Sequence, residues 1–376
     1  MTVLAVLGWL PLLIAVAAIG YTAHATLALR TFAREPLPEP ARPEPVTLLK
    51  PLHGSEPALA ANLATFLAQE WSAPIQMLAG TNRADDPALA VARALPNVVV
   101  RTDAPAIGAN AKICNLANLV SAASHDIVIL SDSDMAVPPD YLARVVAALA
   151  MPGVGAVTCL YHGRGDAGAA SRFAAAAIGW QFTPSVVMSL ALRVEHPCMG
   201  STIALRRSTL DAIGGFQAFA DLLADDYAIG AAVRRLGLRV DPVPRLLIAH
   251  GCVEDSLGAV WRHELRWSAT LRAVNRAGHA GSVLTHPMPL GLLVLPFHAA
   301  PALVATLAAM VARVLLARQS DVLAGHRPAP SWWLPARDLF SFAVFVASFF
   351  ARSVDWRGAT LRMEGDGRVT AEPELT

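Results

Sequence analysis

The stretch Ile127-Val128-Ile129-Leu130-Ser131-Asp132-Ser133-Asp134 joins a short apolar run to an abrupt polar end. An apolar run of this length, bounded by polar residues, predicts a strand that is buried on both faces of a sheet. The carboxylates at positions 132 and 134 then follow the carboxyl end of that strand. Ligands bind at this edge of an open α/β sheet, so we expect the functional site to include Asp132 and Asp134.

Strands and helices alternate in the sequence before this stretch. Strands are predicted at residues 46–49, 75–79 and 97–101, and helices at residues 56–69, 87–95 and 111–123. Strands that alternate with helices of this length indicate a parallel, doubly wound sheet, and we assign residues 36–280 to one α/β domain. The proline-rich residues 35–45 precede this domain as a stiff, extended spacer.

The apolar surplus of the chain lies near its two ends. Hydrophobic residues make up 55% of the 376 residues and charged residues only 16%, and residues 1–29 and 277–312 contain no Asp, Glu, Lys or Arg. A helix of about 20 apolar residues crosses a bilayer, which excludes a wholly soluble or disordered protein. The net charge of +1 gives no indication of a nucleic-acid binder. Four widely spaced cysteines without a CxxC pair indicate neither a zinc site nor a redox pair.

Residues 1–30 are predicted to form an N-terminal transmembrane helix. A cleaved signal peptide is the alternative, because Ala23-His24-Ala25 resembles a cleavage site. The apolar run is longer than the signal-peptide core of about 7–15 residues, and no basic residue precedes it, which favours an uncleaved anchor. Arg30 and Arg34 follow the run, so the positive-inside rule predicts that the α/β domain faces the cytoplasm.

A second membrane region is predicted at residues 282–352, with two to three helices, before a C-terminal tail at residues 353–376. Residues 282–312 contain four prolines. One long tilted helix and two short passes hinged near Pro301 both remain open. Residues 339–351 form a shorter uncharged run, which alone indicates an interfacial or re-entrant helix.

Two further features bear on the membrane. A mutual pairing of Arg337 and Asp338, next to Trp332 and Trp333 as interface anchors, would allow the run at residues 339–351 to cross the bilayer. The apolar residues 173–192 fit either the domain core or an interfacial helix beside which a lipid acceptor enters. Pro184 argues against one straight membrane-spanning helix there.

Carboxylates mark the candidate site. Asp132 and Asp134 are suited to one hard cation shared with phosphate oxygens, whereas a turn or helix cap is the alternative. Asp225 and Asp226 open a predicted helix, where they either complement the helix dipole or provide a general base.

A basic and aromatic pair closes the polar domain. The guanidinium group of Arg266 has several N–H donors in one plane, which suits a pyrophosphate, and Trp267 provides a planar aromatic ring beside it. A basic helix that binds anionic lipid is the alternative for this segment.

Four features follow one another along the chain and form a pattern: Asp86, Asp132-Ser133-Asp134, Asp226 and Arg266-Trp267. The pattern resembles the D,D,D,(Q/R)xxRW signature of the inverting family 2 glycosyltransferases. More narrowly, it resembles the ceramide glucosyltransferase group and its bacterial hopanoid-biosynthesis relatives, and the resemblance extends to about residue 362. The supporting segments are residues 48–54, 85–88, 110–116, 224–227 and 356–358, which match LLKPLxG, DDPA, NxKxxNL, (E/D)DY and WR(T)G.

The resemblance implies a GT-A-like, Rossmann-type domain that binds a UDP-sugar, with transmembrane helices at both ends. It assigns the general base to Asp226 and a Mg²⁺ or Mn²⁺ ion to Asp132 and Asp134. Arg266 and Trp267, with Lys112, would stabilise the leaving diphosphate. The uridine contacts are assigned to Asp86 and to the backbone near Lys50 and Pro51.

The implied activity is inverting transfer of a hexose from a UDP-sugar to a lipid hydroxyl. The acceptor is a hopanoid polyol of the bacteriohopanetetrol type that receives N-acetylglucosamine, or ceramide that receives glucose, and the protein is a multi-pass protein of a bacterial inner membrane. The Ala-rich composition, with more Arg than Lys, favours the hopanoid. Polysaccharide synthesis and an inactive, membrane-tethered nucleotide-binding scaffold are the alternatives. The sequence departs from the family pattern at His263, where Gln or Arg is usual, and at Arg83, where relatives often have an acid.

Overall fold

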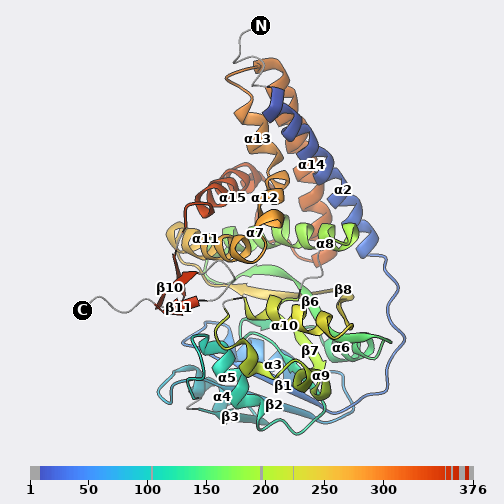
Figure 1. Cartoon of the computed structure of the whole chain (residues 1–376). Helices are drawn as coiled ribbons and strands as arrows, with labels where there is room; N and C mark the ends of the chain where they lie inside the picture. Colours follow the sequence, from blue (N-terminus) through green and yellow to red (C-terminus); the bar gives the residue numbers. More distant parts are fainter. Residues whose placement is uncertain are drawn as a thin grey trace, which may run out of the picture.

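The protein consists of a sheet-containing part and a group of apolar helices that rises from it (Figure 1). A layer of helices lies across the boundary between them, formed by α7 (Ala169–Ala177), α8 (Thr183–Leu192) and α11 (Leu257–Val274). The computed structural model describes residues 9–102, 105–194, 198–222 and 224–351, and the backbone of strands at 353–356, 359–363 and 369–371.

Eight strands form the central sheet in the order β3-β2-β1-β4-β7-β6-β8-β5. Their bounds are β1 Val46–Pro51, β2 Ile75–Gly80, β3 Val98–Arg101, β4 Ile127–Leu130, β5 Met135–Ala136, β6 Val154–Gly165, β7 Ile203–Arg206 and β8 Arg239–Cys252. The first four strands are parallel, as predicted, and so are β6 and β8. The prediction of an all-parallel sheet is wrong for β7, which is antiparallel to β4 and β6, and for β5, which is antiparallel to β8.

The reversed direction of β7 follows from the path of the chain. The chain leaves β6 at Gly165, passes through the transverse helices α7 and α8, and returns to start β7 at Ile203. Because it returns to the end of the sheet from which it left, β7 must run opposite to β6. The sheet is therefore mixed, and the overall architecture is a GT-A-like α/β fold.

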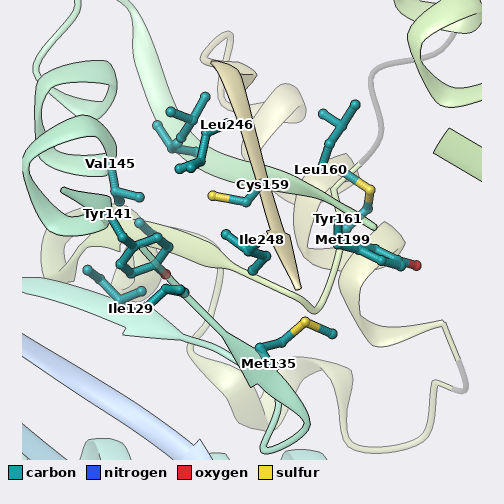
Figure 2. Packing of buried hydrophobic residues seen from close by; sticks show 14 of the residues in the cluster. Ile129, Met135, Tyr141, Val145, Cys159, Leu160, Tyr161, Met199, Leu246 and Ile248 are labelled. Atoms are coloured by element: carbon teal, nitrogen blue, oxygen red, sulfur yellow. The ribbon is translucent and has the colours of Figure 1, made fainter. Parts of the chain in front are cut away.

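Strand β4 is buried on both faces, as the apolar run predicted. Ile127 and Ile129 belong to one hydrophobic cluster, and Val128 and Leu130 belong to another on the opposite face. Figure 2 shows Ile129 packed among side chains from α6, β6 and β8. This period-two alternation places the loop after Leu130 at an edge where it meets neighbouring strand ends.

Six helices pack on the sheet, and α5 and α10 among them carry polar side chains at that edge. They are α3 Leu59–Leu67, α4 Ala88–Arg93, α5 Ala111–Val120, α6 Tyr141–Leu149, α9 Arg207–Ala212 and α10 Asp225–Arg235. A short 3₁₀ turn, η2 (Phe216–Phe219), lies before α10. Both clusters of the core lie between these helices and the sheet.

Three helices of the described residues are long and apolar enough to cross a membrane. They are α2 (Trp9–Phe32), α14 (Ala299–Ala324) and the composite helix Ala169–Leu192. Figure 1 shows α2 and α14 side by side, whereas the composite helix lies across their lower ends. One side of this helix belongs to the hydrophobic core, with Ala175, Ile178 and Val187 among its buried residues, so the domain-core and interfacial alternatives for residues 173–192 both stay open.

The C-terminal membrane region contains a break before α14. The segments α12 (Arg276–Gly281), η3 (Ser282–Thr285) and α13 (Pro287–Leu293) lead into a turn at residues 294–298. The predicted hinge near Pro301 is displaced to this turn, because Pro301 lies in the first turn of α14, where a helix does not need its N–H group.

The composite helix contains a π-turn, η1 (Ile178–Phe182), between α7 and α8. Pro184, which follows this turn, has no N–H group to donate to the carbonyl oxygen of Trp180. Arg313 of α14 donates to that carbonyl instead, at 2.8 Å. The proline is thus accommodated by a wider turn and by a donor from a neighbouring helix.

Arg313 also forms a buried ion pair with Asp338 of α15 (Leu334–Ser348). Its Nε and Nη2 atoms donate to the two carboxylate oxygens at 2.9 and 2.7 Å, and both side chains are 2% exposed. The predicted pairing of Arg337 with Asp338 is wrong, since Arg337 donates to Glu264 of α11. Adjacent residues on a helix face different neighbours, which separates the two partners.

The region predicted as a plain tail contains strands. The strands β9 (Ser353–Trp356), β10 (Ala359–Met363) and β11 (Val369–Ala371) form an antiparallel sheet in the order β11-β10-β9. Of the predicted WR(T)G segment, positions 357–358 lie outside the described residues.

We predict that Asp338→Ala lowers the free energy of unfolding by about 3–5 kcal/mol, because it leaves the Arg313 guanidinium buried without its carboxylate. Thermal unfolding in detergent measures this change. The double variant Arg313→Met, Asp338→Leu should recover most of the loss, because no charge then stays unpaired. As a control, Asp211→Ala on the surface of α9 should change the free energy by less than about 0.5 kcal/mol. An Asp338→Ala variant as stable as the wild type would contradict the role of the pair.

Candidate active site

Lys50 fixes the backbone at the edge where β1 and β4 end. It is 1% exposed, and its Nζ atom donates to Ser131 Oγ at 3.0 Å and to the carbonyl oxygen of Asp132 at 2.9 Å. The ammonium group also lies 3.2 Å from the centre of the Phe66 ring. Strand β1 extends through Lys50 to Pro51, beyond its predicted end. The Lys50 side chain therefore holds the loop after β4 in place through Ser131 and Asp132. The predicted uridine contact of the Lys50–Pro51 backbone stays a prediction.

Lys112 lies between two carboxylates. Its Nζ atom is 2.7 Å from Asp132 Oδ1 and 3.7 Å from Asp225 Oδ2. Burial alone would lower the pKa of Lys112, but the carboxylates of Asp132 and Asp225 outweigh it and raise the pKa. Lys112 comes from the first turn of α5, where Asn110 caps the helix by accepting from the N–H of Ile113. The cap and the ion pairs together hold the ammonium group at the strand edge.

Asp134 pairs with a histidine that sequence reasoning missed. His250, near the end of β8, places its Nε2 atom 3.3 Å from Asp134 Oδ2. Burial raises the pKa of Asp134, but the charge and hydrogen bond of His250, together with the charges of Lys50 and Lys112, outweigh burial and lower the pKa to about 2. The apolar run that ends at His250 was the available signal, since it repeats the pattern of a buried strand followed by a polar residue.

Asp226 is the buried acid with the least charge compensation. Its carboxylate accepts from the N–H groups of Gly200, at 3.1 Å, and Tyr227, at 2.7 Å. Burial, followed by the negative charge of Asp225, raises the pKa of Asp226 to about 6. A carboxylate with a raised pKa is suited to accept a proton near neutral pH.

Gly200 brings the two halves of the site together. A Cβ atom at this position would lie 2.8 Å from Lys112 Nζ and 3.1 Å from Asp132 Oδ2. The backbone at Gly200 thus contacts Asp226 on one side and the Lys112–Asp132 pair on the other. A larger residue here would therefore push the Lys112 ammonium group away from its present position.

Asp225 contributes to the site rather than to a cap of helix α10. The structure shows no side-chain cap at the start of α10, and Asp225 is 5% exposed. Its carboxylate faces Lys112 and lies 3.4 Å from the Asn110 side-chain nitrogen. Asp225 therefore belongs to the charge network of the site.

Trp267 of α11 closes the membrane side of the site. Its ring lies 6.1 Å from the His250 ring and 4.4 Å from the His263 ring. His263, whose role the sequence left open, contacts Glu254 and so forms part of the same wall. Arg266 precedes Trp267 on α11 and is partly exposed. Its predicted contact with a diphosphate stays a prediction.

Asp86 lies apart from this cluster. Both of its carboxylate oxygens are 3.0 Å from the N–H group of Gly54, and Oδ1 also accepts from Ala88 at 2.9 Å. It joins the loop after β1 to the start of α4, so its contacts are those of a positioning residue. Arg83, the departure from the family pattern, pairs with the exposed Asp85.

The residues fit a divalent cation that is shared with a phosphate group. Four buried or partly buried carboxylates, those of Asp132, Asp134, Asp225 and Asp226, share the basic groups of Lys112 and His250. In addition, Asp134 Oδ1 is buried and has no hydrogen-bond partner among the described residues. The described part of the chain contains no group of three or more side chains placed to hold an ion. A hard cation with a few protein ligands and several phosphate oxygens suits this arrangement.

Comparison with protein families covers nearly the whole chain. A family model described as Glycosyl transferase family 21 matches residues 10–369. Ceramide glucosyltransferase 1 of Caenorhabditis elegans is 25% identical over 209 residues, which are 54% of this chain and 44% of the relative. Ceramide glucosyltransferase of Komagataella phaffii is 31% identical over 160 residues, which are 38% and 31%. The chain thus spans less than half the length of these curated relatives. The resemblance to ceramide glucosyltransferases is confirmed, and the matching family is family 21.

A solved structure supports the fold assignment. The mannosyltransferase PcManGT from Pyrobaculum calidifontis, in complex with GDP-Man and Mn²⁺, superposes with a TM-score of 0.50 at 20% identity. The match covers 90% of this chain and 99% of the other. At this identity the similarity establishes a shared fold, which includes the helices outside the sheet.

We predict that Asp134→Asn weakens Mn²⁺ binding, measured in the presence of UDP, by at least about tenfold, or roughly 1.4 kcal/mol, because Asp134 Oδ1 is a buried oxygen without a hydrogen-bond partner among the described residues. Paramagnetic titration of Mn²⁺ provides the measurement. Asp85→Asn is the matched control, since Asp85 is exposed and pairs with Arg83. Equal Mn²⁺ affinity of the wild type and the Asp134→Asn variant would contradict the assignment.

Proposed function

Because the chain belongs to glycosyl transferase family 21 and is a glycosyltransferase, we propose that it transfers a hexose from a UDP-sugar to the hydroxyl group of a membrane lipid. The observation that carries the proposal is Asp226, a buried carboxylate with a pKa of about 6 beside the Lys112–Asp132 pair. The ceramide glucosyltransferase relatives support a lipid acceptor. The acceptor we favour is a hopanoid polyol or ceramide, with N-acetylglucosamine or glucose as the sugar.

In this proposal Asp226 removes the proton of the acceptor hydroxyl. The hydroxyl oxygen then forms a bond to the anomeric carbon of the sugar while the bond from that carbon to the UDP oxygen breaks. A single displacement from the opposite face inverts the anomeric configuration. The N–H groups of Gly200 and Tyr227 hold the Asp226 carboxylate in position for this transfer.

The departing diphosphate requires compensation of its negative charge. A bound Mg²⁺ or Mn²⁺ ion supplies Lewis-acid stabilisation of that charge. Asp134 would hold the ion, with His250 beside it and Asp132 as the second carboxylate of the pair. Arg266 and Lys112 would donate to the diphosphate, and Asp86 would position the loop that binds uridine.

The acceptor reaches the site from the membrane side in our proposal. The transverse helices α7 and α8 lie between the sheet and the apolar helices α2 and α14 (Figure 1), and the Trp267 ring of α11 lies 6.4 Å from that of Phe182, between α7 and α8. Arg30 lies in the last turn of α2 and Arg34 just after it, so the positive-inside rule supports a catalytic part that faces the cytoplasm, which in this proposal is at a bacterial inner membrane.

We predict that Asp226→Asn lowers lipid glycosylation by at least about a hundredfold, because the amide keeps the shape but loses basicity. The affinity for the UDP-sugar should change by less than about tenfold, or roughly 1.4 kcal/mol. Purified protein with UDP-glucose or UDP-N-acetylglucosamine, and ceramide or bacteriohopanetetrol, provides the assay, and mass spectrometry identifies the product. Asp211→Asn, on the surface of α9, should behave as the wild type. Absence of any glycosylated lipid with all four pairs would favour the inactive scaffold instead.

We further predict that transfer falls below a pH of about 6, because protonation of Asp226 removes the base. Asp225→Asn should move this acidic limb to lower pH, because the charge of Asp225 raises the pKa of Asp226. Rates measured from pH 4.5 to 8 at saturating metal and donor decide the matter. An unshifted acidic limb in Asp225→Asn would assign the titrating base to another group.

A further inference from the structure

A row of aromatic rings leads from the catalytic acids toward the membrane helices. His250 contacts Asp134, and its ring stacks on Tyr161 at 5.5 Å between centroids. Tyr161 in turn stacks on Phe182 at 5.0 Å, and Trp267 lies 6.4 Å from Phe182. Phe182 is the last residue of the π-turn η1. The π-turn therefore lies next to the catalytic site on its membrane side.

Gln181, the neighbour of Phe182, carries a primary amide in this apolar helix. Its Nε2 atom donates to Thr285 Oγ1 at 3.1 Å and lies 3.4–3.5 Å from the ring nitrogens of His286. Thr285 and His286 stand at the start of the apolar hairpin formed by α13 and α14. The amide of Gln181, the hydroxyl of Thr285 and the imidazole of His286 thus meet in an apolar part of the protein. Burial of polar groups is energetically unfavourable unless they form hydrogen bonds or serve a function.

This polar group retains capacity for hydrogen bonding. Among the described residues, no hydrogen bond uses the side-chain carbonyl oxygen of Gln181. His279, which is 1% exposed and packs with His286 around Phe345, has a ring nitrogen without a partner. The group can therefore accept at least one further hydrogen bond from a ligand.

The chemistry of the surroundings restricts the ligand to a neutral head group. The arginines nearest to His286 are Arg313 and Arg337, and each is paired with a carboxylate, those of Asp338 and Glu264. Phe342 and Phe345 pack on the other faces of the His286 ring. A lipid with a neutral, hydrogen-bonding head fits this composition, whereas an anionic phosphate would find no unpaired cation in these two arginines.

We propose that Gln181 recognises the acceptor lipid, by accepting a hydrogen bond from a second polar group located next to the hydroxyl that receives the sugar. The proposal rests on the proposed function and adds a specificity-determining residue to it. It predicts a preference for lipids whose head carries an amide N–H or a second hydroxyl over lipids with one hydroxyl group.

The test compares two lipids on three proteins. Short-chain ceramide carries an amide N–H and a second hydroxyl, whereas hexadecanol carries one hydroxyl. The full-length wild type, Gln181→Leu and Gln181→Asn are titrated with each lipid in detergent, and quenching of tryptophan fluorescence reports binding without any need for transfer. The apparent KM for each lipid and the affinity for UDP are measured in parallel. Gln217→Leu is the matched control, because Gln217 is an exposed glutamine on η2.

We expect Gln181→Leu to weaken ceramide binding about tenfold, as for one lost hydrogen bond, and to raise the KM for ceramide similarly. Hexadecanol binding and UDP affinity should be unchanged. Gln181→Asn keeps the amide and should recover part of the ceramide preference. Equal losses for both lipids, or ceramide binding that does not depend on Gln181, would overturn the proposal.

The same measurements separate this proposal from the proposed function. A wild type that glycosylates lipids, with Gln181→Leu unaffected, would overturn acceptor recognition and leave the function intact. Ceramide binding that depends on Gln181, without transfer from either UDP-sugar, would support recognition and contradict the function.

Discussion

The ammonium group of Lys112 is the contact on which the arrangement of the candidate site depends. It joins the loop after β4, through Asp132, to the first turn of α10, through Asp225, and it is itself carried by α5. Without this positive charge, the buried carboxylate of Asp225 and the partly buried carboxylate of Asp132 would repel each other at the edge of the sheet. Gly200 is packed against the same group, so the position of Asp226 also depends on it.

Sequence reasoning found the elements that obey local rules. The strand β4 was predictable because its apolar run is short and ends in polar residues. The helix α2 was predictable because a run of about 20 apolar residues is typical of a membrane-spanning helix. The direction of β7 was not predictable from periodicity, because it depends on the end from which the chain returns to the sheet.

The same limit applies to the site. The places of Asp132 and Asp134 at a strand end and of Asp226 at a helix start were predictable, whereas the roles of these residues stay predictions. The partner of Asp134 is His250, which is distant in sequence and approaches only when β8 joins the sheet. The contact of Asp225 with Lys112 was not predictable either, because the local pattern carries no information about Lys112. Contacts of long sequence separation are therefore what the structure adds.

The π-turn at residues 178–182 makes chain length a stricter constraint than side-chain composition in this segment. A π-turn holds about one residue more than an α-turn, and each residue turns an α-helix by about 100°. Deletion of Gln181 or Phe182 would leave an ordinary α-turn, which completes the turn with one residue fewer and keeps α8 in nearly the same direction. The carbonyl oxygen of Trp180, to which Arg313 donates at 2.8 Å, would then face an N–H group of its own helix instead of the proline. Point substitutions leave this carbonyl free, whereas a one-residue deletion would close it and remove the contact with α14.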